Sequence, residues 1–192
     1  MKKSLLLLLF SVSINAMEVS KINYIIRKAT MQDENNLSIL YKKVASAPGG
    51  LARTEDEITE NYVHKTLYNG VHNGLALVVE HEERIIGCMI KYHLEPKTFS
   101  HVLAEGSVLI DPGFQGKGIG GNLITTFLKE IETNHPNILR VEIIARESNP
   151  AIKLYERLQF KKEGRFEQRI KGINQKFEAD IPMAWFNPNF KQ

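Results

Sequence analysis

Apolar and polar residues along the body of the chain follow two different periods, and the switches between them mark the expected elements. Runs with the strand period of two predict strands at 24–29, 75–80, 85–93, 102–110, 139–145, 160–166 and 176–184. Apolar residues three and four apart predict helices that start near Thr30, Thr54, Gly118 and Asn149 and end near Pro48, Tyr68, Asn134 and Leu158. The chain shows no internal repeat and no obvious linker.

The second helix has a specific start signal. Thr54 and Glu57 have the spacing of a capping box, in which the two side chains satisfy N–H groups of the first helical turn. We therefore expect the second helix to begin at Thr54.

The order of elements predicts the fold class. Strand and helix signals follow one another as β-α-α-β-β-β-α-β-α-β-β between residues 24 and 186. Hairpin-like connections dominate, and one strand-helix-strand unit lies in the middle. We expect one α/β domain whose mixed, mostly antiparallel sheet contains a central βαβ crossover and is flanked by helices.

Composition narrows the functional classes. The 192 residues are enough for one domain with a sizeable core, and the formal net charge of +3 includes no basic tract that would indicate nucleic-acid binding. The single cysteine, Cys88, excludes an internal disulfide, and its apolar neighbours predict a buried small side chain. None of the six histidines has the spacing of a metal ligand, so no metal site is predicted.

The first 16 residues allow two interpretations. Lys2-Lys3, an apolar run from Leu5 to Phe10 and small residues ending at Ala16 have the order of a cleaved secretory signal. The run is too short to span a bilayer, so no integral membrane span is predicted. In the other interpretation translation begins at Met17. The mature protein is exported in the first case and cytoplasmic in the second.

A glycine-rich segment after the fourth strand indicates a phosphate site. Gly116, Gly118, Gly120 and Gly121 open a helix whose first N–H groups have no partner within the helix. These groups and the helix dipole favour an anion, and glycine lets the backbone come close to it. A tight turn without a ligand is the plainer alternative.

The glycines alone do not identify the phosphate ligand. Gly116-x-Gly118-x-x-Gly121 matches the dinucleotide-binding fingerprint, with Glu142 downstream as a ribose contact, and this keeps a nucleotide-binding oxidoreductase as an alternative. The setting argues against it, because the dinucleotide loop follows the first strand of its domain and here several strands come earlier. A P-loop is excluded because glycine follows Lys117.

Two segments resemble the GNAT family of acetyl-CoA-dependent N-acetyltransferases. Gln115, Gly118 and Gly120, after the strand that ends at Asp111-Pro112, fit that family's pyrophosphate loop, Q/R-x-x-G-x-G/A. About 30 residues later, Asn149 to Phe160 resembles its N-x-x-A-x-x-L-Y-x-x-x-G-F block, with Gln159 in place of the usual glycine. Glycine is preferred after a helix for its backbone freedom, so Gln159 is expected to strain or reshape this turn.

The resemblance implies a set of cofactor-binding residues. Backbone N–H groups of the loop would hold the pyrophosphate of acetyl-CoA, the strand end would pair with its pantetheine arm, and an asparagine would lie beside the thioester. The corresponding positions are Gln115, Gly116, Lys117, Gly118, Ile119 and Gly120 for the loop, Leu109 and Ile110 for the strand, and Asn149.

Two further residues are candidates for the chemistry. Glu105 stands where related enzymes often carry a general base, although a solvent-facing strand residue explains it equally well. Tyr155 would protonate the leaving thiolate, and its alternative is packing on the helix face. The N–H of Leu109 or Ile110 would stabilise the oxyanion.

The expected activity is transfer of an acetyl group from acetyl-CoA to a primary amine, by direct attack in a ternary complex. A non-catalytic acyl-CoA-binding module is the main alternative. The resemblance also leaves a homodimer open, because dimers are common in the family.

Overall fold

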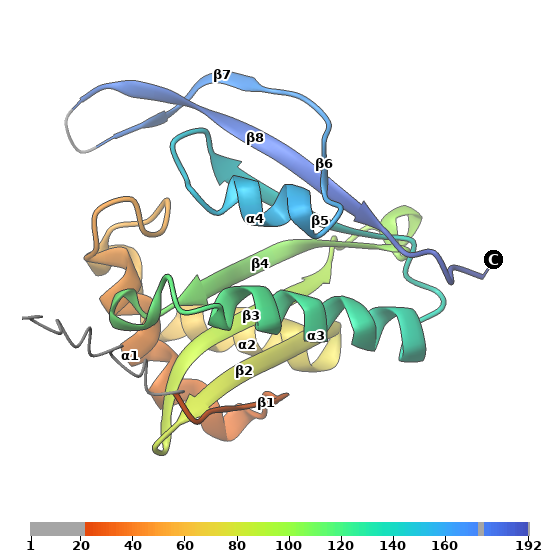
Figure 1. Ribbon diagram of the computed structural model, residues 1–192, viewed down its shortest axis with the longest axis horizontal. Coiled ribbons are helices and arrows are strands. Elements are labelled where there is room, and N and C mark those ends of the chain that lie inside the picture. Colours follow the sequence, from red (N-terminus) through yellow and green to blue (C-terminus); the bar gives the residue numbers. More distant parts are fainter. Residues whose placement is uncertain (1–21, 173–174, 192) are drawn as a thin grey trace, which may run out of the picture.

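A computed structural model of the chain describes residues 22–172 and 175–191. The described residues form one eight-stranded sheet with four α-helices (Figure 1). The strands are β1 (Ile25–Lys28), β2 (Gly74–His81), β3 (Arg84–His93), β4 (Val102–Ile110), β5 (Arg140–Arg146), β6 (Lys161–Lys162), β7 (Phe166–Lys171) and β8 (Phe177–Phe186). The helices are α1 (Glu34–Ala45), α2 (Glu60–His72), α3 (Ile119–Asn134) and α4 (Ile152–Arg157).

The sheet topology confirms the predicted fold class. The strand order is β1-β2-β3-β4-β5-β8-β6, with β7 also paired to β8. Neighbouring strands are antiparallel except β4 and β5, which are parallel and are joined by α3. This β4-α3-β5 unit is the central crossover.

The two parallel strands separate soon after they meet. β4 and β5 pair only at Val102↔Arg140 and Leu103↔Val141. Beyond these pairs β4 stays bonded to β3 as far as Ile110, and β5 stays bonded to β8. The facing edges of β4 and β5 therefore lack a ladder between them, and the two strands diverge toward their carboxyl ends. The gap between the two diverging backbones is called the slot below.

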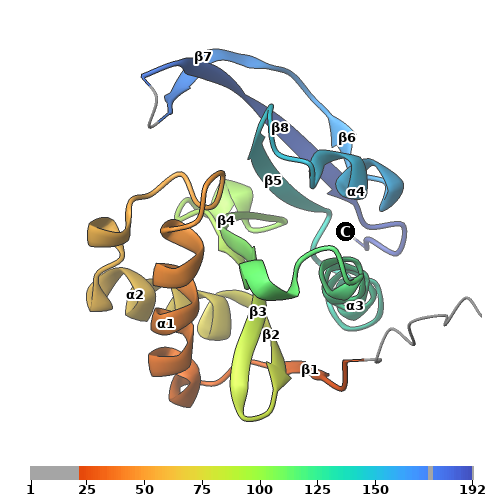
Figure 2. The same cartoon turned by 60° about the vertical axis from the view of Figure 1, so that its left-hand side comes forward.

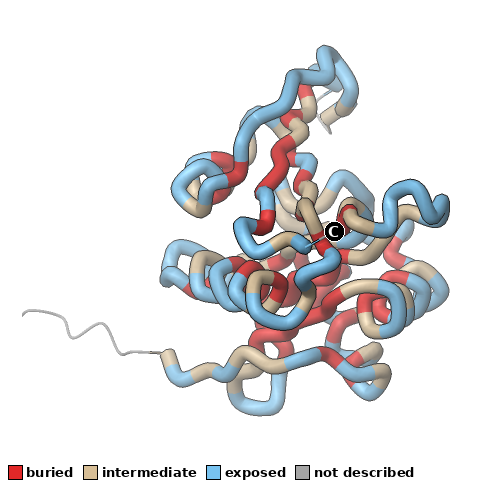
Figure 3. The backbone as a smooth tube through the Cα atoms, turned by 90° about the vertical axis from the view of Figure 1, so that its right-hand side faces the viewer, coloured by how far each residue is buried: buried red, intermediate tan, exposed pale blue. Residues whose placement is uncertain are grey.

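Helices cover the sheet on both faces. α1 and α2 lie on one side of β2 to β4 and α3 on the other, as Figure 2 shows. Each face has its own apolar cluster: Leu37, Leu40 and Leu67 pack under α1 and α2, whereas Leu123, Phe127 and Ile131 pack under α3. Buried positions gather between these layers in Figure 3, while the strand β7, on the projecting arm, is mostly exposed.

Two predicted element boundaries are wrong. The Thr54–Glu57 capping box exists, but it closes the short 3₁₀ turn Glu55–Glu57, and α2 starts later with Thr59 as its N-cap. The strand predicted at 160–166 is split into β6 and the start of β7. Opposite this break lies Pro182, which has no N–H to donate to a neighbouring strand.

The deviation at Gln159 has the predicted effect on the backbone. Gln159 adopts φ of 69°, the left-handed region that favours glycine. The N–H of Gln159 bonds to Glu156 O, and that of Phe160 bonds to Tyr155 O, which is the Schellman pattern.

The signal-like segment 1–16 lies outside the described residues. Within the described part of the chain, no helix is both long and apolar enough to cross a bilayer.

Candidate active site

The loop between β4 and α3 is held in shape by one aspartate. Asp111 is buried, and its Oδ1 accepts a hydrogen bond from the N–H of Gly113 at 2.9 Å. Its Oδ2 accepts from Lys43 Nζ on α1 at 2.8 Å. The Gln115 amide donates to Ile110 O at 3.1 Å, and this bond folds the loop back onto the end of β4.

The glycines of this loop take conformations that other residues avoid. Gly116 and Gly118 have φ of 73° and 80°, and a Cβ at either position would meet no atom within 4 Å. Glycine is therefore required for the backbone path, and the space beside it is open. A Cβ at Gly120 would come within ordinary contact distance of Ile110, which places the first turn of α3 against the end of β4.

The geometry fits an anion at the start of α3. Gly118 is the N-cap, and the first bond inside the helix joins the N–H of Asn122 to Gly118 O at 3.1 Å. The N–H groups of Gly116, Lys117 and Gly118 have no acceptor among the described residues. Free N–H groups at a helix N-terminus are the donors that a pyrophosphate needs. The Lys117 side chain bends back to Gly113 O, at 3.0 Å.

The slot between β4 and β5 begins beside this loop. Leu109 and Ile110, the last residues of β4, pair with β3 on one side. On the other side the edge of β4 is free, because β5 has already diverged. An extended ligand arm that starts at the loop has an unpaired strand edge to bond, as an added strand does.

Tyr155 lies on the α3 side of the slot. It is 6% exposed, belongs to the apolar cluster under α3, and its ring centroid is 5.9 Å from that of Phe160. No described residue hydrogen-bonds its hydroxyl. Burial raises the pKa of Tyr155 to about 12, so the phenol stays protonated at neutral pH and can donate a hydrogen bond.

Asn149 has a clear local role. Its Oδ1 accepts from the N–H of Ala151 at 2.9 Å, and its carbonyl accepts from the N–H of Ile152. The side chain thereby shapes the turn that leads into α4, and its amide nitrogen remains available to a ligand.

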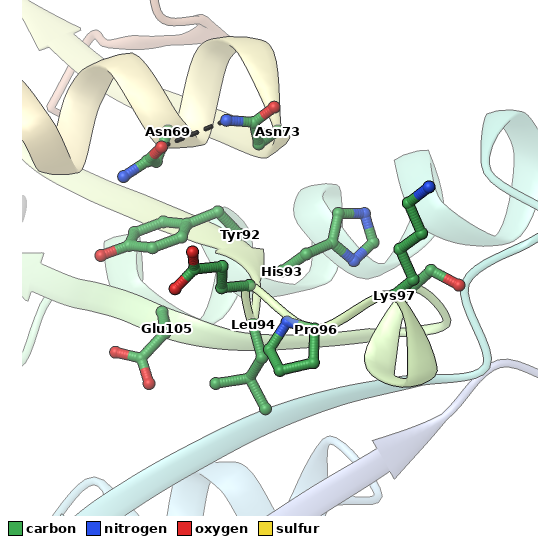
Figure 4. Close-up of a pocket in the computed structure, with 10 residues that line it drawn as sticks. Asn69, Asn73, Tyr92, His93, Leu94, Pro96, Lys97 and Glu105 are labelled. Carbon is green, nitrogen blue, oxygen red and sulfur yellow. Dashed lines mark hydrogen bonds between the residues drawn. The ribbon is translucent and has the colours of Figure 1, made fainter.

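Glu105 lies on the opposite face of the sheet from Tyr155. Its exposed side chain lines a hollow of about 630 Å³ at the C-terminal end of α2. Figure 4 shows Tyr92 between Glu105, on the strand below it, and the C-terminal end of α2, where Asn69 and Asn73 lie. Tyr92 packs with the cluster under α1 and α2, and burial, followed by the Glu105 charge, raises the pKa of its phenol. The two catalytic candidates therefore face the slot region from opposite sides.

Three polar residues near the site were not predicted from the sequence. Lys43 and Asp111 are far apart in the chain, and no periodic pattern links them. Lys91 on β3 is 4% exposed, and its Nζ donates to Ala104 O at 2.5 Å. A lysine that ends an otherwise apolar strand run is a weak signal, and only the fold shows that it is buried.

The described residues form an α/β domain with an anion cradle beside the gap between two diverging parallel strands. Residues 72–162 match the family model described as the acetyltransferase (GNAT) domain. A search of curated protein sequences finds no match.

Solved structures share the same fold. Similar ones include an acetyltransferase of the GNAT family from Streptococcus pneumoniae, with 19% identity, a TM-score of 0.71, and coverage of 85% of this chain and 99% of the other. A ribosomal-protein-alanine N-acetyltransferase from Brucella melitensis has 23% identity, a TM-score of 0.72, and coverage of 84% and 99%. A Salmonella typhimurium protein solved with acetyl-CoA as its cofactor has 19% identity, a TM-score of 0.68, and coverage of 85% and 94%. Residues 72–162 thus resemble the acetyltransferase (GNAT) domain, and the described chain has the fold of these acetyltransferases.

The dinucleotide interpretation of the glycine loop is wrong. The loop follows the fourth strand, and three antiparallel pairings precede it, whereas a dinucleotide fold starts with parallel βαβ units. Glu142 lies inside β5, where its Oε1 is 2.8 Å from Arg140 Nε, and not at the end of a strand.

Proposed function

We propose that this enzyme transfers the acetyl group of acetyl-CoA to a primary amine by direct attack in a ternary complex. The observation that carries the proposal is the position of the slot. Its glycine loop and Tyr155 belong to the α3 side of the sheet, and Glu105 faces a hollow on the α2 side. The two substrates can then approach the reacting carbon from opposite faces, without a covalent intermediate on the protein.

The roles of the residues follow from this placement. The N–H groups of Gln115 to Gly120 bind the pyrophosphate, and the free edge of Leu109 and Ile110 pairs with the pantetheine arm and supplies an oxyanion donor. Tyr155 donates a hydrogen bond to the sulfur as it leaves. Glu105 removes the proton from the amine, directly or through water.

How much Glu105 must contribute as a base depends on the pKa of the acceptor amine. Deprotonating a lysine-like amine at pH 7 costs about 4.6 kcal/mol, whereas an α-amine costs about 1 kcal/mol. Three structural neighbours are named as acetyltransferases of ribosomal-protein alanine, which supports amines of peptides among the acceptors to test.

A thiol-release assay across amino acids, polyamines and peptides tests the proposal. We expect CoA release that depends on one class of primary amine and falls in Glu105→Gln. Glu95→Gln is the matched control, because Glu95 lines the same hollow. Thermal shift with acetyl-CoA, CoA and NAD runs in parallel. Binding of acetyl-CoA without release for any amine would identify a non-catalytic acyl-CoA-binding module.

A further inference from the structure

A buried lysine lies where the slot between β4 and β5 closes. Leu103 and Val141 form the last pair between these strands, and Ala104 is the next residue of β4. The Ala104 carbonyl accepts a hydrogen bond from Lys91 Nζ at 2.5 Å. The ammonium group of Lys91 is therefore at the closed end of the slot.

Lys91 reaches this point across the sheet from β3. Its Cα partner on β4 is Gly106 and its partner on β2 is Leu75, a member of the apolar cluster under α3. Gly106 has no side chain, so it places none in the path of the lysine across β4. The charges of Glu105 on β4 and Glu142 on β5 also act on the ammonium and partly offset the effect of burial on its pKa.

An ammonium at such a site is unusual. Lys91 is 4% exposed, and no carboxylate lies within ion-pair distance of it among the described residues. Burying a charge with only a carbonyl partner is unfavourable, and burial lowers the pKa of Lys91 to about 8. The hydrogen bond to Ala104 accounts for one polar contact, but a leucine or valine would fill this core position without that cost.

The acyl group is expected to point toward this lysine, an argument that rests on the proposed function. The pyrophosphate site follows the carboxyl end of β4, so the pantetheine arm runs back along β4 from Ile110 toward Leu103. The acyl group is attached at the far end of this arm. Each methylene added to it extends further toward the closed end, where the Lys91 ammonium bonds to Ala104 O.

We propose that Lys91 forms the end wall of the acyl slot and sets the longest acyl chain that the enzyme accepts. The wall consists of the aliphatic stem of Lys91, held across Gly106 by the bond from its ammonium group to Ala104 O. Acetyl fits in front of this wall, and chains that reach it are rejected.

Acyl-CoA thioesters of increasing length, from acetyl to octanoyl, test this proposal. Binding is measured by isothermal titration without an acceptor, and transfer by thiol release. For the wild type we expect a sharp fall in affinity and kcat/KM at one chain length, by about 10- to 200-fold per methylene beyond it. Lys91→Ala is expected to move this fall to chains at least two carbons longer.

Lys91→Met is the matched variant, because it keeps the length of the stem and removes the charge. It is expected to leave the fall at the wild-type chain length. The proposal is overturned if the fall stays in place in folded Lys91→Ala, if the wild type shows no fall, or if both variants shift it equally. Circular dichroism checks that each variant is folded. Failure of acetyl-CoA to bind the wild type would instead contradict the proposed function.

Discussion

Tyr155 has the properties of a hydrogen-bond donor and not of a strong acid. Burial raises its pKa to about 12, whereas an ordinary thiol titrates near 8.5. Full proton transfer from this phenol to a free thiolate is uphill. A hydrogen bond to the sulfur, stronger as negative charge develops there, is the contribution that its environment favours.

Replacing Tyr155 by phenylalanine tests this role. The ring and its contact with Phe160 are kept, and only the hydroxyl is lost. We expect kcat to fall about 10²- to 10³-fold, the range for loss of one hydrogen-bond donor to a developing charge, with little change in the affinity for acetyl-CoA. Steady-state kinetics and titration calorimetry measure the two quantities. Unchanged turnover in this variant would show that Tyr155 serves only packing.

Gln159 offers a prediction about stability at one residue. A side chain in the left-handed region costs about 1–2 kcal/mol, and glycine removes this strain while increasing the entropy of the unfolded chain. We expect Gln159→Gly to raise the free energy of unfolding by about 0.5–1 kcal/mol. Urea denaturation measures it, with Gln168→Gly, also at positive φ but on the exposed strand β7, for comparison. A destabilised Gln159→Gly would mean that the glutamine side chain makes a contact worth more than the strain.

Residues within local motifs were predictable, and those joined by tertiary contacts were not. Gly116 and Gly118 adopt the positive φ that their positions in the loop imply, and Gln159 deviates as expected. Lys43 and Asp111 are 68 residues apart, and their bond exists only because α1 packs beside the loop. Lys91 shows the same limit, since the sequence cannot tell a buried lysine from an exposed one.

At the level of elements, α1 and the phosphate loop are linked by that bond. Lys43 is half exposed, whereas Asp111 is mostly buried and also holds the N–H of Gly113. Exposed ion pairs contribute only about 0–1 kcal/mol to stability. The Lys43–Asp111 bond therefore adds a small amount to the stability of the loop conformation and is not its main cause. A change in α1 is nevertheless expected to alter the loop that Asp111 supports.

The Lys43 link gives a prediction for cofactor binding. We expect Lys43→Met to weaken acetyl-CoA binding about two- to fivefold, because the loop loses one support on the α1 side. Calorimetry at low and high salt measures it, and the difference from wild type should shrink at high salt. Lys42→Met is the control, since Lys42 is exposed on the same helix. An equal loss in both variants would point to the net charge of α1 and not to the link.

The types of the elements could be predicted from the hydrophobic periodicity, but the separation of β4 from β5 could not. Both strands of the crossover have ordinary apolar patterns, and nothing in Val102–Ile110 or Arg140–Arg146 marks where they part. The separation depends on what each strand bonds to on its other side, β3 for β4 and β8 for β5. The break between β6 and β7 was missed for a similar reason, because Pro182 acts on the strand opposite to it.

At the scale of the whole molecule, one ion cluster fastens the first strand to the rest of the domain. Arg27 on β1 donates to both carboxylate oxygens of Asp33, at 2.7 and 2.9 Å, and to Glu80 on β2 at 2.7 Å. Asp33 is 5% exposed and also accepts from the N–H of Thr30 just before α1. The cluster joins β1, β2 and the start of α1, so its loss is expected to affect global unfolding.

The pH dependence of stability tests this cluster. The hydrogen bonds from Arg27, then that from Thr30, hold the pKa of Asp33 below its usual range, while Arg27 stays charged throughout. A lowered carboxylate pKa contributes stability above the unfolded value of about 3.9, and this contribution is lost as pH falls through the folded value. We expect Asp33→Asn to lower the free energy of unfolding at pH 7 by about 1.5–3 kcal/mol, the range for hydrogen bonds to charged groups. The difference in free energy of unfolding between variant and wild type should stay constant down to about pH 5 and narrow below about pH 4.

Urea denaturation at several pH values measures this difference. The control is Asp56→Asn, which replaces an exposed acid without an ion pair among the described residues. A gap that persists unchanged at acid pH would show that Asp33 acts through its shape in the turn and not through its charge.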